Sequence, residues 1–81
     1  MNKGEIETSV RKILADLTAD KDALEIQADV RIRDQLDLDS MDFLNFLIAV
    51  DAELHVDIPE ADYPRLRTLN DIVDYLSPKV A

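Results

Sequence analysis

The sequence predicts an all-α fold: a small four-helix bundle with three main helices and a short third one. Apolar residues recur at spacings of three and four in three separate segments, as expected for helices that bury one face. The chain has one glycine and three prolines against 47% hydrophobic residues, which favours helices over a turn-rich sheet. Its 81 residues allow one domain, residues 1–81, with one core.

The first helix is expected to run from about residue 3 to residue 18. Charged residues occupy its other sides, so we assign this helix a packing role only. The residues of its core-facing side are Ile6, Val10, Ile13, Leu14 and Leu17.

A long connection, residues 19–38, follows the first helix. A structureless loop of this length is unusual in a compact domain, so we expect its apolar residues to anchor it across the helices. These anchors are Leu24, Ile26, Val30, Ile32, Leu36 and Leu38.

The next helix is expected to begin at Asp39, which can cap it, with Asp42 completing a short-acid capping box. No glycine or proline interrupts residues 43–54, so about three turns can form. One stripe faces the core and consists of Phe43, Phe46, Leu47, Val50 and Leu54. A second apolar stripe on the other side consists of Met41, Leu44 and Ile48. Two interpretations of it stay open: burial on both sides of the helix, or a strip that docks a partner.

A brief third helix is predicted over residues 59–63, because Pro59 takes Ile58 out of helical geometry and suits a first helical position. Pro64 should limit its length. His55, the only histidine, precedes this turn, and we expect it at the surface near a helix end because no nucleophile pairs with it.

Thr68 and Asp71 form another short-acid capping box, which predicts the start of the last helix. We expect this helix to end at Pro78. Its inward stripe consists of Leu69, Ile72, Val73 and Leu76.

Ser40 stands where the acidic segment Leu36–Asp39 becomes the long apolar helix. The ordinary role of a serine here is to cap the helix, but Asp39 can do so and leave Ser40 available. The unpaired N–H groups and partial positive charge of a helix N-terminus would favour a phosphoryl group on Ser40. These residues are compatible with a phosphoryl group on Ser40, but they do not by themselves require one.

Composition narrows the function classes. The net charge of −9 disfavours nucleic-acid binding and favours basic partner surfaces. With no cysteine, the chain offers no disulfide, thiol nucleophile or thiolate metal site, and an EF-hand pattern counted from Asp37 fails at Met41 and Asp42. We expect no metal site. No apolar run approaches a membrane span and no secretory leader is seen, so we expect the protein in the cytoplasm. Without a cysteine, a glycine-rich phosphate loop or a histidine-centred set of residues, we do not expect an enzyme. We also expect a monomer.

The segment Leu36-Asp-Leu-Asp-Ser40-Met41 resembles the Asp-Ser-Leu motif of the acyl carrier protein family, in which 4′-phosphopantetheine esterifies the serine. The likeness continues through Asp51–Leu54, Val56–Pro59 and Thr68-Leu69 at the family's spacing, and with the first helix covers nearly the whole chain.

The resemblance implies that Ser40 accepts 4′-phosphopantetheine from coenzyme A through a phosphopantetheinyl transferase, with Asp39 capping the helix and helping to orient that enzyme. The thiol of the arm would then carry an acyl group as a thioester between enzymes of fatty acid, specialised lipid or polyketide synthesis. Met41, Leu44 and Ile48 would form the apolar part of the surface that docks partners. Asp42, Asp51 and Glu53 would supply negative charge at its rim. Residues expected to line the space for an acyl chain are Phe43, Phe46, Leu47, Val50, Ile58, Leu69, Ile72 and Leu76.

The chain departs from the family pattern at three positions: Asp37 replaces a common glycine, and Asn45 and Ala52 replace common acids. These departures indicate a specialised carrier. Two alternatives stay open: an aminoacyl or peptidyl carrier, and an unmodified helical interaction module in which Ser40 is only a cap. For Arg31 and Arg33 we expect neutralisation of neighbouring carboxylates, with contact to the phosphate of the arm as the second interpretation.

Overall fold

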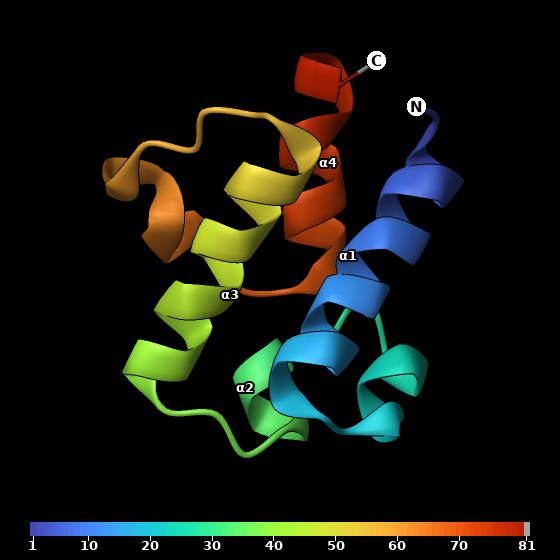
Figure 1. Ribbon diagram of the computed structural model, residues 1–81, viewed down its shortest axis with the longest axis vertical. Helices are drawn as coiled ribbons and strands as arrows, with labels where there is room; N and C mark the ends of the chain where they lie inside the picture. The colour runs from blue at the N-terminus through green and yellow to red at the C-terminus, as the bar shows by residue number, and fades with distance from the viewer. Residues whose placement is uncertain (81) are drawn as a thin grey trace.

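The computed structural model describes residues 1–80, which fold into four α-helices and two 3₁₀ helices (Figure 1). The predicted all-α bundle is confirmed, and the short third helix is the 3₁₀ helix η2. In chain order the elements are α1 (Lys3–Thr18), η1 (Lys21–Glu25), α2 (Ile32–Gln35), α3 (Ser40–Leu54), η2 (Glu60–Arg65) and α4 (Leu69–Val80).

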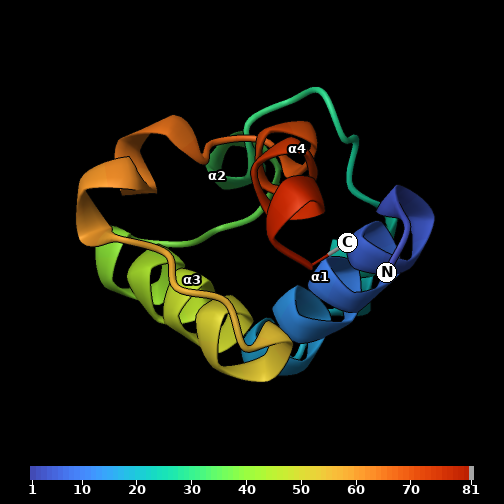
Figure 2. The ribbon, with the colours of Figure 1, turned by 90° about the horizontal axis from the view of Figure 1, so that it is seen from above.

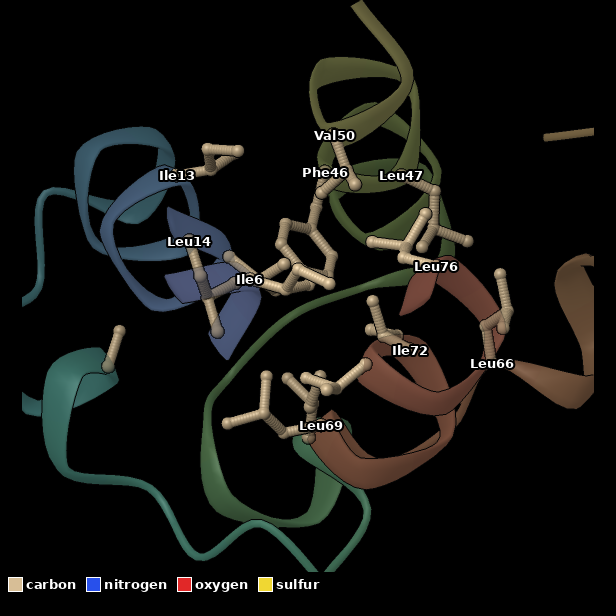
Figure 3. Close-up of a cluster of buried hydrophobic side chains, with 14 of the residues drawn as sticks. Ile6, Ile13, Leu14, Phe46, Leu47, Val50, Leu66, Leu69, Ile72 and Leu76 are labelled. Atoms are coloured by element: carbon tan, nitrogen blue, oxygen red, sulfur yellow. The ribbon is translucent and has the colours of Figure 1, made fainter. Parts of the chain in front are cut away.

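The three long helices enclose one core. α1 packs against both α3 and α4, and Figure 2 shows the three arranged around a common centre. The side chains that fill it point toward one another from all three helices (Figure 3). The most deeply buried large side chains include Ile6, Leu14, Phe46, Leu47, Leu69, Ile72 and Leu76. The amino group of Met1 donates a 3.0 Å hydrogen bond to the carbonyl of Val80, which brings the ends of α1 and α4 together.

The helix ends follow local chemistry. The Thr68–Asp71 box is confirmed: the amide of Asp71 donates to the Thr68 hydroxyl at 3.0 Å, and the amide of Thr68 donates to the Asp71 carboxylate at 3.1 Å. A second box between Asn2 and Glu5, which sequence reasoning missed, starts α1. His55 ends α3 in the left-handed conformation, at the surface as expected.

The prediction that the last helix ends at Pro78 is wrong, because α4 continues to Val80. Proline at this position removes one amide donor to the carbonyl four residues earlier, that of Asp74. Both Pro78 and Asp74 are exposed, so water can satisfy that carbonyl and the last turn can form around the proline.

The connection 19–38 contains η1 and α2, and most of its predicted anchors are buried or half-buried. Leu24 is an exception at 46% exposure, because η1 instead buries its neighbour Ala23. The carbonyls of Leu24 and Ile26 accept hydrogen bonds from the Arg11 guanidinium at 3.0 and 2.8 Å, so a polar side chain of α1 holds this segment. Leu17, predicted in the core, is 45% exposed in the last turn of α1.

Candidate functional site

Ser40 is the first residue of α3 and is exposed. Asp39 is the N-cap, and its carboxylate accepts a 2.8 Å hydrogen bond from the amide of Asp42. The return bond of a full capping box is not formed between these residues. Because Asp39 performs the capping, the Ser40 hydroxyl engages no hydrogen-bond partner among residues 1–80. It therefore lies free at the positive end of a fifteen-residue helix.

The second apolar stripe of α3 faces outward. Met41 is 62% exposed and Ile48 is 49% exposed, whereas Leu44 is half-buried. Burial of this helix on both sides, one of the two interpretations, is therefore wrong. Two exposed side chains of this length on one helix face leave an apolar strip that begins beside Ser40.

The acidic residues near this strip differ in exposure and in hydrogen bonding. Asp42 and Glu53 are exposed, whereas Asp51 is half-buried. The Asp51 carboxylate accepts a 2.9 Å hydrogen bond from the amide of Ile58, so this side chain fixes the chain that leaves α3. The Asp51 carboxylate is therefore partly engaged inside the protein and less available to a partner.

A groove of about 630 Å³ opens beside Ser40. Phe43, Leu44 and Leu47 of α3 form its apolar wall. Tyr63 and Pro64 of η2, with Leu66, form another side. The remaining lining residues are Leu38, Arg31, Arg33, Asp34 and Arg67. The volume lies in the range of sites for small molecules.

The structure brings two of the eight residues predicted to line an acyl chain, Phe43 and Leu47, to this groove. The others fill the core instead, each at most 4% exposed, and they are Phe46, Val50, Ile58, Leu69, Ile72 and Leu76. The rings of Phe43 and Phe46 contact each other with centroids 5.7 Å apart, which joins the groove wall to the core. Sequence reasoning missed Leu38, Tyr63, Pro64, Leu66 and Arg67 as groove residues.

The wall formed by η2 buries none of its own residues, and polar contacts of Asp62 hold it. The Arg65 guanidinium lies 2.6 Å from the Asp62 carboxylate, which also accepts a hydrogen bond from Tyr75 of α4. The Tyr75 hydrogen bond, followed by Arg65, holds the pKa of Asp62 below its usual value. The same carboxylate and partial burial raise the pKa of Tyr75 to about 12.

The expected neutralisation by Arg31 is confirmed, since its Nε lies 2.9 Å from the Asp34 carboxylate. Arg33 differs: its Nε donates to the carbonyl of Leu38 at 3.3 Å, two residues before Ser40. Both arginines line the groove together with Ser40. An exposed hydroxyl, free helix N–H groups and nearby guanidinium groups form a set of residues that a phosphoryl group fits.

The comparisons with known proteins decide the family. The family model described as "Phosphopantetheine attachment site" matches residues 8–76. An acyl carrier protein of Thermosynechococcus vestitus is 32% identical over 82 residues, covering 100% of this chain and 99% of that protein. The chain belongs to the acyl carrier protein family. The cofactor of this family's attachment domain is 4′-phosphopantetheine. An acyl carrier protein of Petrotoga mobilis is 31% identical over 81 residues, which are 99% of this chain and 93% of that protein.

Solved structures agree with the fold. The solution structure of a putative acyl carrier protein from Anaplasma phagocytophilum superposes with a TM-score of 0.85 at 22% identity, covering 100% of this chain and 94% of that one. The acyl carrier protein of Enterococcus faecalis gives 0.76 at 26% identity, covering 96% and 98%. None of the helices in residues 1–80 is long and apolar enough to cross a membrane.

Proposed function

We propose that Ser40 is the attachment point of the phosphopantetheine arm and that this acyl carrier protein transports acyl groups between enzymes. The observation that carries the proposal is the exposed Ser40 hydroxyl at the N-terminus of α3, left free because Asp39 caps the helix. When bound, the arm supplies a terminal thiol that holds an acyl group as a thioester.

In the transfer reaction, the Ser40 oxygen bonds to the pantetheine-linked phosphorus of coenzyme A and loses its proton to a base of the transferase. The phosphorus–oxygen bond to the adenine nucleotide breaks, and that nucleotide leaves. The unpaired N–H groups of the first turn of α3 and the helix dipole would favour the charge of the new phosphodiester. Asp39 keeps its place as the cap and orients this turn.

The outward strip of α3 is the proposed docking face for the transferase and for enzymes that load or use the acyl group. Met41 and Ile48 supply exposed apolar contacts, with Leu44 between them. Asp42 and Glu53 supply exposed negative charge for basic partner surfaces, to which Asp51 contributes less.

The chemistry of the pathway is proposed from residue type. Asn45 and Ala52 are exposed on α3 and carry no charge, so this face is less acidic than the family pattern. Such a face suits partners whose docking surfaces are less basic, which favours specialised lipid, polyketide or aminoacyl synthesis over the housekeeping fatty acid pathway.

Incubation with coenzyme A and a broad-specificity phosphopantetheinyl transferase tests the attachment. Intact mass spectrometry should show that the wild type and Ser9→Ala gain the arm and that Ser40→Ala does not. A wild type that stays unmodified with several active transferases would favour the interaction module instead. In that case the exposed strip of α3 would bind partners without any arm.

A further inference from the structure

One wall of the groove is cationic, although the protein carries a net charge of −9. Three of the nine lysine and arginine residues, Arg31, Arg33 and Arg67, line it, and Asp34 is the one acid among the lining residues. Guanidinium groups gathered in a concave site of an acidic protein create a local positive potential.

Two of these arginines form no ion pair with the residues that the structure describes. Arg31 pairs with Asp34 at 2.9 Å. Within residues 1–80, no carboxylate lies within ion-pair distance of Arg33 or Arg67. The Nε of Arg33 donates to the Leu38 carbonyl, which leaves its two terminal nitrogens free to bind an anion. Neutralisation of neighbouring carboxylates therefore does not account for Arg33 and Arg67.

The backbone fixes this wall in place. The amide of Ile32 donates a 3.0 Å hydrogen bond to the carbonyl of Arg67, and Arg31 forms a bridge with Thr68. The start of α2 is thus joined to the segment before α4, so the backbone of residues 31–32 lies next to that of residues 67–68. Phe43, Leu44 and Leu47 of α3 supply the apolar wall of the same groove.

The groove follows α3 from Ser40 to Leu47, a distance of about 10 Å along the helix axis. A phosphodiester bonded to Ser40 would lie at the first turn of α3, where the helix N–H groups favour its charge. A ligand that fills the groove has to be longer than this phosphodiester. It has to present an apolar side to α3 and an anion to the arginines.

We propose that this groove selects an acyl group that ends in a carboxylate. The inference rests on the proposed attachment at Ser40, from which the flexible arm brings the acyl group within reach of the groove. Its methylene groups pack on Phe43, Leu44 and Leu47, and its terminal carboxylate binds the guanidinium groups of Arg33 and Arg67.

The test compares two acyl groups on the same protein. A phosphopantetheinyl transferase loads the chain from octanoyl-coenzyme A or from the analogue of equal length that ends in a carboxylate, and intact mass confirms loading. The rate at which hydroxylamine cleaves each thioester then reports how well the groove holds the acyl group. The carboxylate-ended group should be cleaved more slowly, and added salt should reduce the difference.

Substitutions test whether the arginines of the groove cause the slower cleavage. Arg67→Gln and Arg33→Gln should each speed cleavage of the carboxylate-ended group by roughly two- to fivefold, the range expected for loss of one exposed ion pair. Both should leave the octanoyl group unchanged. Arg67→Lys keeps the charge and should recover part of the protection. The matched control is Lys12→Gln, which removes one charge from an exposed site on α1 outside the groove and should have no effect.

Three results would overturn the inference. Equal cleavage of the two loaded groups would leave the attachment intact and exclude selection of an acidic acyl group. The NMR signals of the Arg33 and Arg67 Nε–H groups can be compared between protein with the unacylated arm and protein with the acidic acyl group. Equal shifts in the two would show that the arginines bind the phosphate of the arm instead. Failure of both groups to load would overturn the proposed function itself.

Discussion

The hydroxyl of Tyr75 in α4 donates a 2.6 Å hydrogen bond to the carboxylate of Asp62 in η2. Because η2 buries none of its own residues, this bond ties one side of the groove to the body of the bundle. This bond, between residues thirteen apart in the chain, therefore helps to hold Tyr63 and Pro64 in the groove, together with the packing of Tyr63 against the core.

Tyr75→Phe removes this hydrogen bond and keeps the ring, so η2 should open more often. The amides of Asp62 and Leu66, which bond to carbonyls of Pro59 and Tyr63, should exchange with solvent severalfold faster. Amides in the centre of α1 should keep their exchange rates. Hydrogen exchange measured by NMR checks both, and unchanged exchange in η2 would show that Tyr75 does not hold this wall.

The lowered pKa of Asp62 makes part of the stability depend on pH. The unfolded chain takes up this proton at a higher pH than the folded one, so the contribution is present above the usual pKa of 3.8 and is lost as pH falls through the folded value. Urea unfolding of wild type and Asp62→Asn should show a wild-type advantage at about pH 7 that disappears on acidification below about pH 4. An advantage that is constant across this range would contradict the assignment.

The raised pKa of Tyr75 has the opposite dependence. Its contribution is present below the unfolded value of 10.0 and is lost as pH rises toward the folded value of about 12. The same unfolding experiment in alkaline buffer, with Tyr75→Phe as the reference, should therefore show the wild-type advantage falling in this range.

How far the sequence predicts the fold depends on whether the signal is local. The helix starts at Asp39 and Thr68 follow from residues three apart, and the structure confirms both caps. The prediction that the last helix ends at Pro78 is wrong, because an exposed last turn tolerates the loss of one backbone N–H donor. Leu24 is exposed because η1 buries Ala23 instead. A hydrogen bond from Arg11 to the Leu24 carbonyl holds this segment, a contact across thirteen residues that no periodicity reveals.

The groove was harder to predict for the same reason. The periodicity of α3 indicates which residues share a face, and it separates the outward Met41 and Ile48 from the buried Phe46 and Val50. It does not indicate that Arg67 comes to lie beside the start of α2, since that depends on a backbone hydrogen bond between distant segments. The wall lined by arginines could therefore not be read from spacing.

Two helices end in residues whose backbone adopts the unfavourable left-handed conformation. Ala19 after α1 has φ 55°, and His55 after α3 has φ 54°. A side chain in this region costs about 1–2 kcal/mol, and glycine avoids it while losing more entropy on folding. Ala19→Gly and His55→Gly should each raise the free energy of unfolding by about 0.5–1 kcal/mol in urea titrations. A loss of stability in both variants would exclude the left-handed conformation at these positions.

The docking face can be tested with matched substitutions. Ile48→Glu and Leu24→Glu replace leucine-sized side chains of nearly equal exposure, 49% and 46%, on α3 and η1. Ile48→Glu should slow phosphopantetheine transfer at least about fivefold, the effect of losing one apolar contact worth about 1 kcal/mol. Leu24→Glu should not slow it, and circular dichroism should show equal helix content in both. Equal transfer rates would place the docking face elsewhere.

Peptide fragmentation by mass spectrometry, on protein purified from its own cells, locates the arm on the chain. The chain contains three serines, Ser9, Ser40 and Ser77. The fragment ions should place the phosphopantetheine arm on Ser40. An arm on Ser9 or Ser77, or native protein that bears no arm in any preparation, would contradict it.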